Sequence, residues 1–324
     1  MIISRAPFRI TLAGGGTDLP AYYKQHGSTF LSCAINKYIY VGLRKRDFEK
    51  EVRLQYLDCE SVPHVSQLKH NRARACLELH GFEDAVEIIS SADLSACSGM
   101  GSSGAYLVAL LNCIRTFKGL STDPNIIAEE ACRIEMDILN EPVGKQDQYI
   151  AAHGSITKFT INKKGQVRPA KLNIPPDIIV ALENNCMIFY TGVLRDASSV
   201  LASQQKNISY DNSAMHAIQQ IGFDTIKAIN SGNLNKFGYL MHEHWLQKKK
   251  LSKRITVDKF EWIYQDLIDS NLALGGKIIG AGGGGFVVLY VPKKHSLVES
   301  KMIDLGFPRM NWKVSMSGLS TCSW

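Results

Sequence analysis

A glycine- and serine-rich segment, LSACSGMGSSGA at Leu94–Ala105, contains the residue types that bind phosphate groups. Small residues leave backbone N–H groups accessible, and serine hydroxyls add further donors for an anion. The apolar stretch YLVALLNC at Tyr106–Cys113 follows directly and predicts a buried helix. A helix that begins in such a loop adds unpaired N–H groups and the positive end of its dipole. The segment therefore predicts a phosphate-binding loop, although a helix N-terminus built of small residues explains the spacing equally well.

Two further glycine clusters lie far from this loop in the sequence: RAPFRITLAGGGTDLP at Arg5–Pro20 and KIIGAGGGGFVVLY at Lys277–Tyr290. Each lies beside an apolar run with β-strand character. Glycine costs about 0.5–1 kcal/mol in chain entropy relative to alanine, and it adds no side-chain packing. Glycine runs are typical of places where a ligand or another backbone approaches closely. Each cluster alone indicates a tight turn, whereas three in one chain favour a shared anionic ligand.

The composition is that of a globular chain without a specialised tail. The 324 residues are 45% apolar and 21% charged, and their formal net charge is +7. This charge is compatible with nucleic acid and also with phosphorylated substrates. The densest basic stretch, KKKLSKR at Lys248–Arg254, ends a helix-like segment and is typical of a solvated helix face. Because there is no basic arm and no zinc pattern, no nucleic-acid partner is expected.

The cysteines and the apolar runs indicate a cytoplasmic location. The eight cysteines are scattered and form no C-x-x-C pair, which favours reduced thiols over disulfides or zinc ligands. The N-terminal apolar run is too short for a signal peptide. No stretch reaches 18 apolar residues, so no membrane partner or membrane span is expected.

Hydrophobic periodicity predicts strands and helices mixed through the whole chain. The strands are expected at Ile2–Leu12, Leu31–Arg44, Val52–Tyr56, Val86–Ser91, Ile150–Phe159, Ile178–Thr191, Phe286–Val291 and Trp312–Met316. The helices are expected at Gln67–His80, 104–117, 124–139, Ser198–Ser231, Asn233–Leu251, Val257–Asn271 and His295–Leu305. No regular βαβ period is present, which favours an α+β protein over a doubly wound sheet. The Pro175–Pro176 pair predicts a boundary between two domains, 1–175 and 176–324.

Three motifs, taken together and in this order, make the chain similar to the GHMP kinases, the superfamily of galactokinase, homoserine kinase, mevalonate kinase and phosphomevalonate kinase. APFR at Ala6–Arg9, followed by AGGGTD at Ala13–Asp18, resembles the first motif. SGMGSSGA at Ser98–Ala105 resembles the phosphate loop, usually written G-L-G-S-S-A. GAGGGG at Gly280–Gly285 resembles the third motif. The motifs span nearly the whole chain, so the resemblance covers both expected domains.

The resemblance implies a fold and a place for the nucleotide. The N-terminal domain would resemble ribosomal protein S5 domain 2, and the C-terminal domain would be ferredoxin-like, with ATP and acceptor meeting between them. The phosphate loop would bind ATP. In this loop Met100 replaces the usual leucine and Gly104 stands where alanine is usual. The residues implied to bind the nucleotide are Ser98, Gly99, Met100, Gly101, Ser102, Ser103 and Gly104. The adenine pocket is expected near Lys37–Arg46 and Asp93–Cys97.

The segment EMDILNEPVGKQD at Glu135–Asp147 matches the galactokinase-type segment that runs from a magnesium-binding glutamate to a catalytic aspartate. The resemblance implies that Glu135 and the Ser103 hydroxyl hold Mg²⁺, a cation that prefers hard oxygen ligands. Asp147 would accept or orient the proton of the attacking hydroxyl. Arg9 would pair with Asp147 and stabilise charge on the transferred phosphoryl group. Taken alone, Glu135 fits a solvated helix residue, Asp147 a helix N-cap and Arg9 a structural ion pair.

The resemblance also implies which residues meet the acceptor. Asp18 matches the sugar-binding aspartate of galactokinase-like members. The first motif is of the type found in bacterial heptose kinases, which phosphorylate the anomeric hydroxyl of D-glycero-D-manno-heptose 7-phosphate. The residues implied to contact such a substrate are Gly15, Gly16, Thr17, Asp18, Arg195, Gly282 and Gly283. Arg195, Lys248, Lys249 and Lys253 are candidates to bind the 7-phosphate, and Arg195 has the better geometry because its guanidinium group can bind two oxygens.

Several alternatives stay open at this point. The acceptor is expected to be a small-molecule sugar or sugar phosphate, and a free sugar of the fucose or galactose type becomes the better substrate if no phosphate pocket exists. A non-catalytic, kinase-like sugar sensor would lack Ser103, Glu135 or Asp147, all of which are present. A homodimer is compatible with the sequence. His153, His242 and His244 fit no metal spacing, which favours packing or substrate contact.

Overall fold

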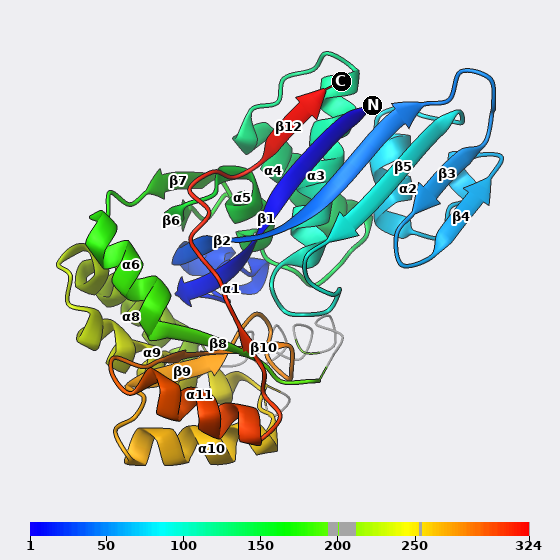
Figure 1. The fold of residues 1–324 in the computed structure, drawn as a ribbon. Helices are drawn as coiled ribbons and strands as arrows, with labels where there is room; N and C mark the ends of the chain where they lie inside the picture. The colour runs from blue at the N-terminus through cyan, green and yellow to red at the C-terminus, as the bar shows by residue number, and fades with distance from the viewer. Residues whose placement is uncertain (194–199, 201–211, 253–254, 324) are drawn as a thin grey trace.

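Two long antiparallel strands, β1 (Ile2–Ala13) and β2 (Ser28–Lys45), form the centre of the larger of two sheets in the computed structural model (Figure 1). The structure describes residues 1–193, 200, 212–252 and 255–323. The pairing of β1 with β2 shifts register between Pro7 and Arg9 and again between Thr11 and Ala13. Proline has no N–H to give to a strand ladder, so an irregularity beside Pro7 is expected. Such bulges redirect side chains, and Arg9 follows the first one.

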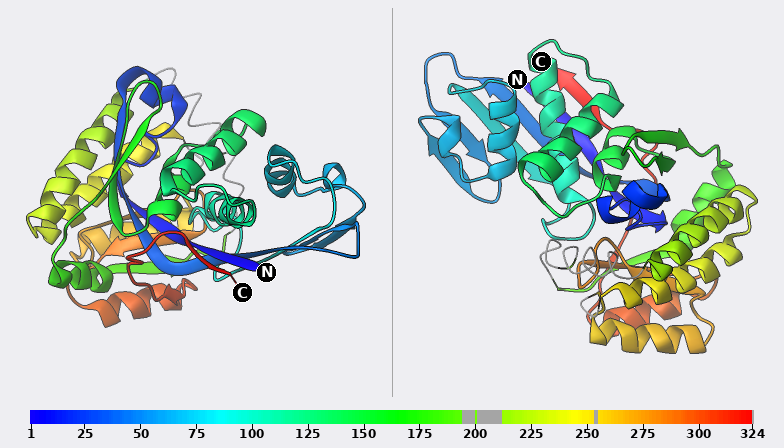
Figure 2. Two further views of the ribbon diagram at one scale, coloured as in Figure 1. Left: turned by 90° about the horizontal axis from the view of Figure 1, so that it is seen from above. Right: turned by 180° about the vertical axis from the view of Figure 1, so that it is seen from behind.

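The larger sheet has eight strands and draws on both ends of the chain. Its order is β12-β1-β2-β5-β3-β4, with β6 pairing with both β2 and β7. The further strands are β3 (Val52–Gln55), β4 (Cys59–Val62), β5 (Val86–Ala92), β6 (Ile156–Ile161), β7 (Val167–Lys171) and β12 (Ser320–Ser323). Strand β12 pairs with β1 through Ile2–Ser323 and the following residues, so the two termini lie next to each other (Figure 2).

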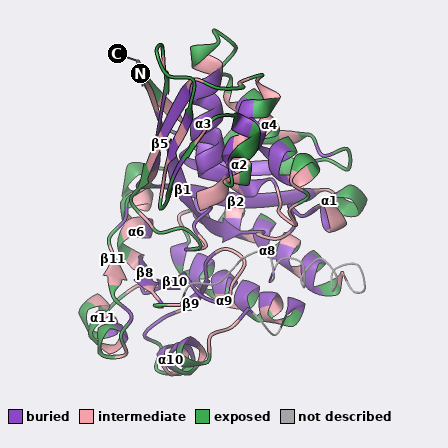
Figure 3. Ribbon diagram, turned by 90° about the vertical axis from the view of Figure 1, so that its right-hand side faces the viewer, coloured by how far each residue is buried: buried purple, intermediate pink, exposed green. Residues whose placement is uncertain are grey.

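One helix anchors the core of this half. Helix α3 (Ser102–Phe117) packs on β1 and β2, and its residues from Gly104 to Ile114 are buried. A helix that is apolar on all sides belongs inside a fold, and Figure 3 shows it buried along most of its length. Around it lie α1 (Pro20–His26), the 3-10 helix η1 (Val65–Gln67), α2 (Asn71–Leu79), α4 (Pro124–Arg133), the π-helix η2 (Ile134–Ile138) and α5 (Gln146–His153).

The second half of the chain is built on a four-stranded antiparallel sheet. Its order is β11-β8-β10-β9, formed by β8 (Cys186–Tyr190), β9 (Gly275–Ile278), β10 (Phe286–Tyr290) and β11 (Arg309–Met310). Its helices are α6 (Pro176–Asn185), α8 (Ser213–Asn230), α9 (Leu234–Leu251), α10 (Asp258–Asp269) and α11 (His295–Asp304). None of the helices within the described ranges is both long and apolar enough for a bilayer crossing.

The two-part α+β fold class predicted from the sequence is confirmed, but some elements differ. The strand expected at Ile150–Phe159 is wrong in its first half, which is the end of helix α5, and β6 begins only at Ile156. The strand expected at Ile178–Thr191 begins as helix α6 instead. Pro176 explains this start, because the fixed φ of proline suits the first turn of a helix. The β-branched residues that follow it were misleading.

Two other expectations met a different outcome. At Trp312–Met316 only Val314 forms a β-bridge, with Ile35, so the expected strand is wrong. The N–H groups of Lys313 and Val314 donate instead to the Asn36 and Glu183 side chains, at 2.7 and 2.8 Å. The helix expected over Ser198–Ser231 is described from Ser213 onward as α8, and most of its expected first part lies outside the described residues.

Candidate active site

The predicted phosphate loop opens helix α3 with free backbone donors. Gly101 precedes the helix in the left-handed conformation, with φ +81°, and no side chain caps the helix start. The N–H groups of the first helical turn have no partner within a helix. Arg9 fixes the loop from the side, because its backbone N–H donates to the Met100 carbonyl oxygen at 3.0 Å. The N-terminus of α3 therefore offers N–H groups and the positive end of the dipole to an anion.

Two cavities meet at this helix N-terminus. We call the first the inner cleft; it is lined by Arg9, Asp18, Ser102, Ser103, Glu135 and Asp147 among others. We call the second the outer pocket; it has a volume of about 660 Å³ and is lined mainly by β5, the 90–97 segment and α2. Cys97, Ser102, Ser103 and Val143 line both. A volume of this size suits a small organic ligand, so one molecule can reach from the outer pocket past α3 into the inner cleft.

The outer pocket contains aromatic side chains that the sequence did not indicate. Its walls include Ile39 and Asp93–Cys97, as expected for the adenine pocket, together with Tyr56, His70 and Tyr106. The ring of His70 lies 4.8 Å from the ring of Tyr56 and 5.1 Å from that of Tyr106, measured between centroids. Flat apolar surfaces of this kind suit a planar heterocycle.

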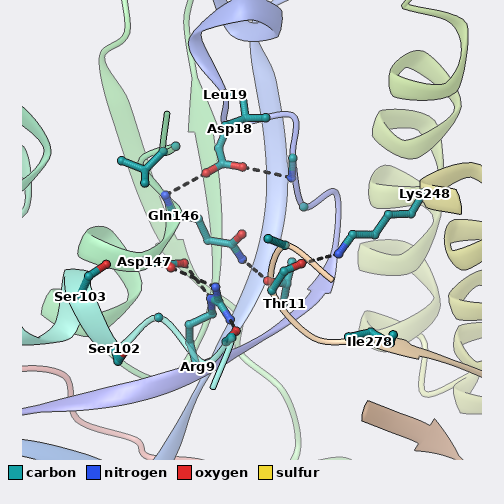
Figure 4. A pocket seen from close by; sticks show the side chains of 18 of the residues that line it. Arg9, Thr11, Asp18, Leu19, Ser102, Ser103, Gln146, Asp147, Lys248 and Ile278 are labelled. Carbon is teal, nitrogen blue, oxygen red and sulfur yellow. Dashed lines mark hydrogen bonds and ion pairs between the residues drawn. The ribbon is translucent and has the colours of Figure 1, made fainter. Parts of the chain in front are cut away.

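Asp147 and Arg9 form a bidentate pair at the inner cleft (Figure 4). The Arg9 Nε donates to Asp147 Oδ1 at 2.7 Å, and its Nη2 donates to Oδ2 at 3.0 Å. Its third nitrogen, Nη1, donates to the Gly99 carbonyl oxygen at 2.6 Å. The Arg9 side chain is nearly buried, whereas that of Asp147 is 27% exposed. Two parallel hydrogen bonds fix the orientation of a carboxylate, so Asp147 is held in place with lone pairs still able to accept a proton donor.

Gly104 gives Asp147 the room that it needs. A Cβ atom at position 104 would lie 2.9 Å from the Cβ of Asp147 and 3.0 Å from the backbone N of Gln148. These distances are shorter than real contacts allow, so α5 approaches α3 closely only because this residue is glycine. The sequence assigned Gly104 to the phosphate loop; the structure adds a packing reason for it.

Asp18 lies buried above the same cleft. Its Oδ1 accepts the N–H of Gly16, and its Oδ2 accepts the N–H of Gln146, each at 3.1 Å. Burial raises the pKa of this carboxyl group, and the nearby charge of Asp147 adds to the effect. Gly15 and Gly16 also line the cleft. Thr17 is fully buried and its hydroxyl donates to the Gly14 carbonyl oxygen at 2.7 Å, which is a structural role in the turn.

The third glycine motif packs on the phosphate loop. A Cβ atom at Gly280 would lie 2.4 Å from the Gly99 carbonyl oxygen, and one at Gly285 would lie 2.2 Å from that of Ser98. The two backbones therefore touch, which explains a glycine run without a ligand. Ser98 and Met100 are buried within this contact. Among the described residues that line the inner cleft, Gly280 and Ala281 represent this motif.

Gly282 and Gly283, expected to contact substrate, lie elsewhere. Gly283 donates its N–H to the Ile255 carbonyl oxygen at 2.7 Å, and a Cβ atom at Gly282 would lie 2.8 Å from the Ile255 side chain. Their surroundings are therefore main chain and an apolar side chain. Arg195 and Lys253, two candidates for a substrate phosphate, lie outside the described residues.

Glu135 has the burial and the neighbours that a magnesium ligand requires. It is fully buried in the π-helix η2, and π-helical turns often mark functional sites. It lines the inner cleft together with Ser103. Its carboxylate accepts from Arg72 Nε at 3.1 Å and from the Gln148 side-chain amide. Gln148 Oε1 is buried without a hydrogen-bond partner. This set of hard oxygen atoms fits Mg²⁺, which usually takes one or two carboxylates besides phosphate oxygens and water.

Three basic residues of the second half also line the inner cleft. Of the candidates from the KKKLSKR segment, Lys248 points into the cleft, whereas Lys249 pairs with Glu261 at 2.7 Å on the helix exterior. Lys277, on β9, and His244, on α9, join Lys248. The sequence missed Lys277, because a single lysine before an apolar strand carries no motif. Burial lowers the pKa of Lys248 to about 7; Arg9 lowers it further, and Asp18 opposes this.

Replacing Lys248 with methionine is expected to reveal this lowered pKa in the stability of the protein. Between pH 7 and Lys248's ordinary pKa of 10.5, the folded protein holds fewer protons on this group than the unfolded chain. The free energy of unfolding of the wild type should therefore rise relative to that of the variant over this range, and the difference should be constant below pH 7. Urea unfolding at a series of pH values measures it. A difference that does not change with pH would contradict the burial of a lysine charge.

The comparisons with known proteins agree with this geometry. Family models for the N-terminal and the C-terminal domains of GHMP kinases match residues 68–155 and 225–302, which together make up just over half of the chain. A D-glycero-alpha-D-manno-heptose 7-phosphate kinase of Campylobacter jejuni is 28% identical, over 94% of each chain. An L-fucokinase/L-fucose-1-P guanylyltransferase of Bacteroides fragilis is 27% identical over 94% of this chain, which spans 36% of that longer protein.

A similar solved structure supports the fold. The crystal structure of a D-glycero-D-manno-heptose 1-phosphate kinase from Bacteroides thetaiotaomicron has a TM-score of 0.80 and 24% identity, and the match covers 100% of this chain and 99% of the other. The chain belongs to the GHMP kinase family. It is an ATP-dependent phosphotransferase with an alcohol acceptor, a sugar kinase.

Proposed function

We propose that the chain transfers the γ-phosphate of ATP to the anomeric hydroxyl of D-glycero-D-manno-heptose 7-phosphate, giving the 1,7-bisphosphate. The observation that carries the proposal is the paired Asp147 carboxylate, which faces the same cleft as Ser102 and Ser103. The similarity to the Campylobacter enzyme over 94% of both chains supports the choice of acceptor.

In this proposal the outer pocket takes the nucleoside and the N-terminus of α3 takes the phosphates. The helix N–H groups and the hydroxyls of Ser102 and Ser103 aim the γ-phosphate into the inner cleft. The transition state of phosphoryl transfer needs positioning and charge stabilisation more than covalent chemistry. Glu135 and Ser103 would hold Mg²⁺, which, when bound, neutralises charge on the transferred phosphate.

The acceptor lies between Asp18 and Asp147. Asp147 accepts a hydrogen bond from the anomeric hydroxyl and takes its proton as the new P–O bond forms. Arg9, bound to both oxygens of Asp147, stabilises charge on the phosphoryl group in flight. Asp18 accepts hydrogen bonds from other sugar hydroxyls, while Gly15 and Gly16 let the substrate approach the backbone. A cytoplasmic location, where thiols stay reduced and ATP is supplied, completes the proposal, and the protein acts as a monomer or a homodimer.

An ADP-release screen with free and phosphorylated hexoses and heptoses tests this function. We expect the heptose 7-phosphate to give the highest kcat/KM, and ³¹P NMR of the product to place the new ester on C1. The fucokinase relative supports a second candidate, a kinase of a free sugar. Turnover of free L-fucose or D-galactose, with none for the sugar phosphate, would replace the first proposal by the second. Absence of ADP release with every sugar would favour a sensor.

A further inference from the structure

His244, Lys248 and Lys277 form a buried basic cluster on one wall of the inner cleft. Their exposed fractions are 2%, 8% and 2%. His244 and Lys248 lie one turn apart on α9, and Lys277 lies on β9, which packs against α9. All three line the inner cleft, and none of them lines the outer pocket. Figure 4 places Lys248 across the cleft from Ser102 and Ser103.

The cluster has fewer partners than its chemistry demands. Both ring nitrogens of His244 are buried without a hydrogen-bond partner. Lys277 Nζ donates to the Leu12 carbonyl oxygen at 3.1 Å, and Lys248 Nζ donates to that of Gly280. Within the described ranges, no ion pair within 4 Å joins either lysine to a carboxylate. Buried ammonium groups are costly unless an opposite charge lies close, and two of them beside Arg9 increase that cost.

The nearby acids do not supply the missing charge. Asp147 is held by Arg9 through both of its oxygens. Asp18 uses its oxygens to accept backbone N–H groups, and its burial raises its pKa. A polar wall with an unpartnered imidazole and two singly bonded ammonium groups therefore favours a bound anion with several acceptor oxygens. Phosphate has the required charge and oxygens, and charge-assisted hydrogen bonds to it are strong.

We propose that His244, Lys248 and Lys277 form the subsite for a phosphate group that the acceptor sugar already carries, at the end remote from its reacting hydroxyl. This inference rests on the proposed function and assigns specificity for a sugar phosphate to this wall of the cleft. The transferred phosphate enters from the opposite wall, at the N-terminus of α3. The acceptor thus spans the cleft from the basic cluster to Asp147, and its two ends are distinguished by charge.

The subsite accounts for rejection of free sugars. A free sugar leaves the buried cations without a counter-charge, whereas a sugar phosphate supplies it. Each hydrogen bond to a charged group contributes about 1.5–3 kcal/mol, which corresponds to about ten- to hundredfold in affinity. We therefore expect the wild type to bind D-glycero-D-manno-heptose 7-phosphate at least about a hundredfold more tightly than the free heptose.

The test measures binding of these two sugars by calorimetry to the full chain without nucleotide, for the wild type, Lys248→Met, Lys277→Met and His244→Phe. Each lysine variant should weaken binding of the 7-phosphate by about ten- to hundredfold and change binding of the free heptose much less. Lys250→Met is the matched control, because Lys250 lies on the same helix but is exposed and bonded to Gln247. It should leave both affinities unchanged.

Melting temperatures separate this role from a structural one. Removing a buried ammonium group that lacks a counter-charge should leave the melting temperature of the ligand-free protein equal or higher. A lower melting temperature with an unchanged ratio of the two affinities would overturn the proposal and give the cluster a packing role. If Lys277→Met proves insoluble, Lys248→Met and His244→Phe still measure the ratio.

The outcomes also separate this inference from the proposed function. If the wild type phosphorylates the heptose 7-phosphate and both lysine variants keep its affinity, the function stands and the subsite is wrong. If the heptose 7-phosphate is not phosphorylated but inorganic phosphate or mannose 6-phosphate binds in a way that needs Lys248 and Lys277, the subsite stands and the acceptor is wrong. Equal affinity for phosphorylated and free sugars in the wild type would overturn the subsite.

Discussion

Replacing Asp147 with alanine is expected to lower kcat by about 10²–10⁴-fold, the usual contribution of a positioned acid or base. The variant loses the group that accepts the proton of the acceptor hydroxyl, and Arg9 loses the partner that fixes its guanidinium group. Binding of ATP should persist, because the donors at the N-terminus of α3 are unchanged. Steady-state ADP release gives kcat, and calorimetry with a non-hydrolysable ATP analogue gives the nucleotide affinity.

Two further variants make this result specific. Asp147→Asn keeps the shape of the side chain but cannot take the proton, so its kcat should be nearly as low as that of the alanine variant. Asp137→Ala, in the same segment but at an exposed position, is the control and should retain wild-type turnover. Near-normal turnover of Asp147→Ala would remove this carboxylate from the chemistry.

Replacing Gly104 with alanine restores the residue that is usual at this place in the family, yet it is expected to lower kcat by about a hundredfold. The new Cβ atom would lie 2.9 Å from the Cβ of Asp147 and 3.0 Å from its backbone carbon. Helix α5 must therefore move away from α3, and Asp147 moves with it. Displacement of a catalytic group by about 1 Å costs about 10²-fold in rate. Steady-state kinetics with saturating ATP and acceptor measure this loss.

Gly119→Ala serves as the control for a general loss of stability. Gly119 has φ +65° and nothing within 4 Å of an added Cβ atom, so alanine there strains only the turn after α3. We expect it to lower the free energy of unfolding by about 1–2 kcal/mol and to leave kcat unchanged. Equal losses of kcat in both variants would attribute the Gly104 effect to stability rather than to the position of Asp147.

The sequence predicted those parts of the site that depend on local patterns. The glycine motifs near Gly15, Gly101 and Gly280 did converge, because close backbone contact leaves glycine as its trace. The spacing from Glu135 to Asp147 placed both carboxylates at the inner cleft. The strands β1, β2, β5 and β10 were also found, since each buries a long apolar run.

Other parts depend on tertiary contacts that leave no local pattern. Lys277 and His244 become a pair only when β9 packs on α9, so neither carried a signal in the sequence. Helix α6 has the β-branched residues of a strand, and only its context and the proline at its start decide for a helix. Gly282 and Gly283 could not be separated from Gly280 by composition, although their neighbours differ.

The pairing of β12 with β1 has a practical consequence for dissecting the molecule. Because the last strand forms the edge beside Ile2–Arg5, residues 1–175 expressed alone would expose an open row of backbone groups there. Trimming the final five residues should have the same effect and promote self-association. By contrast, a short flexible linker joining the two ends would allow the chain to be reopened at an exposed loop, giving a circular permutant that retains every strand.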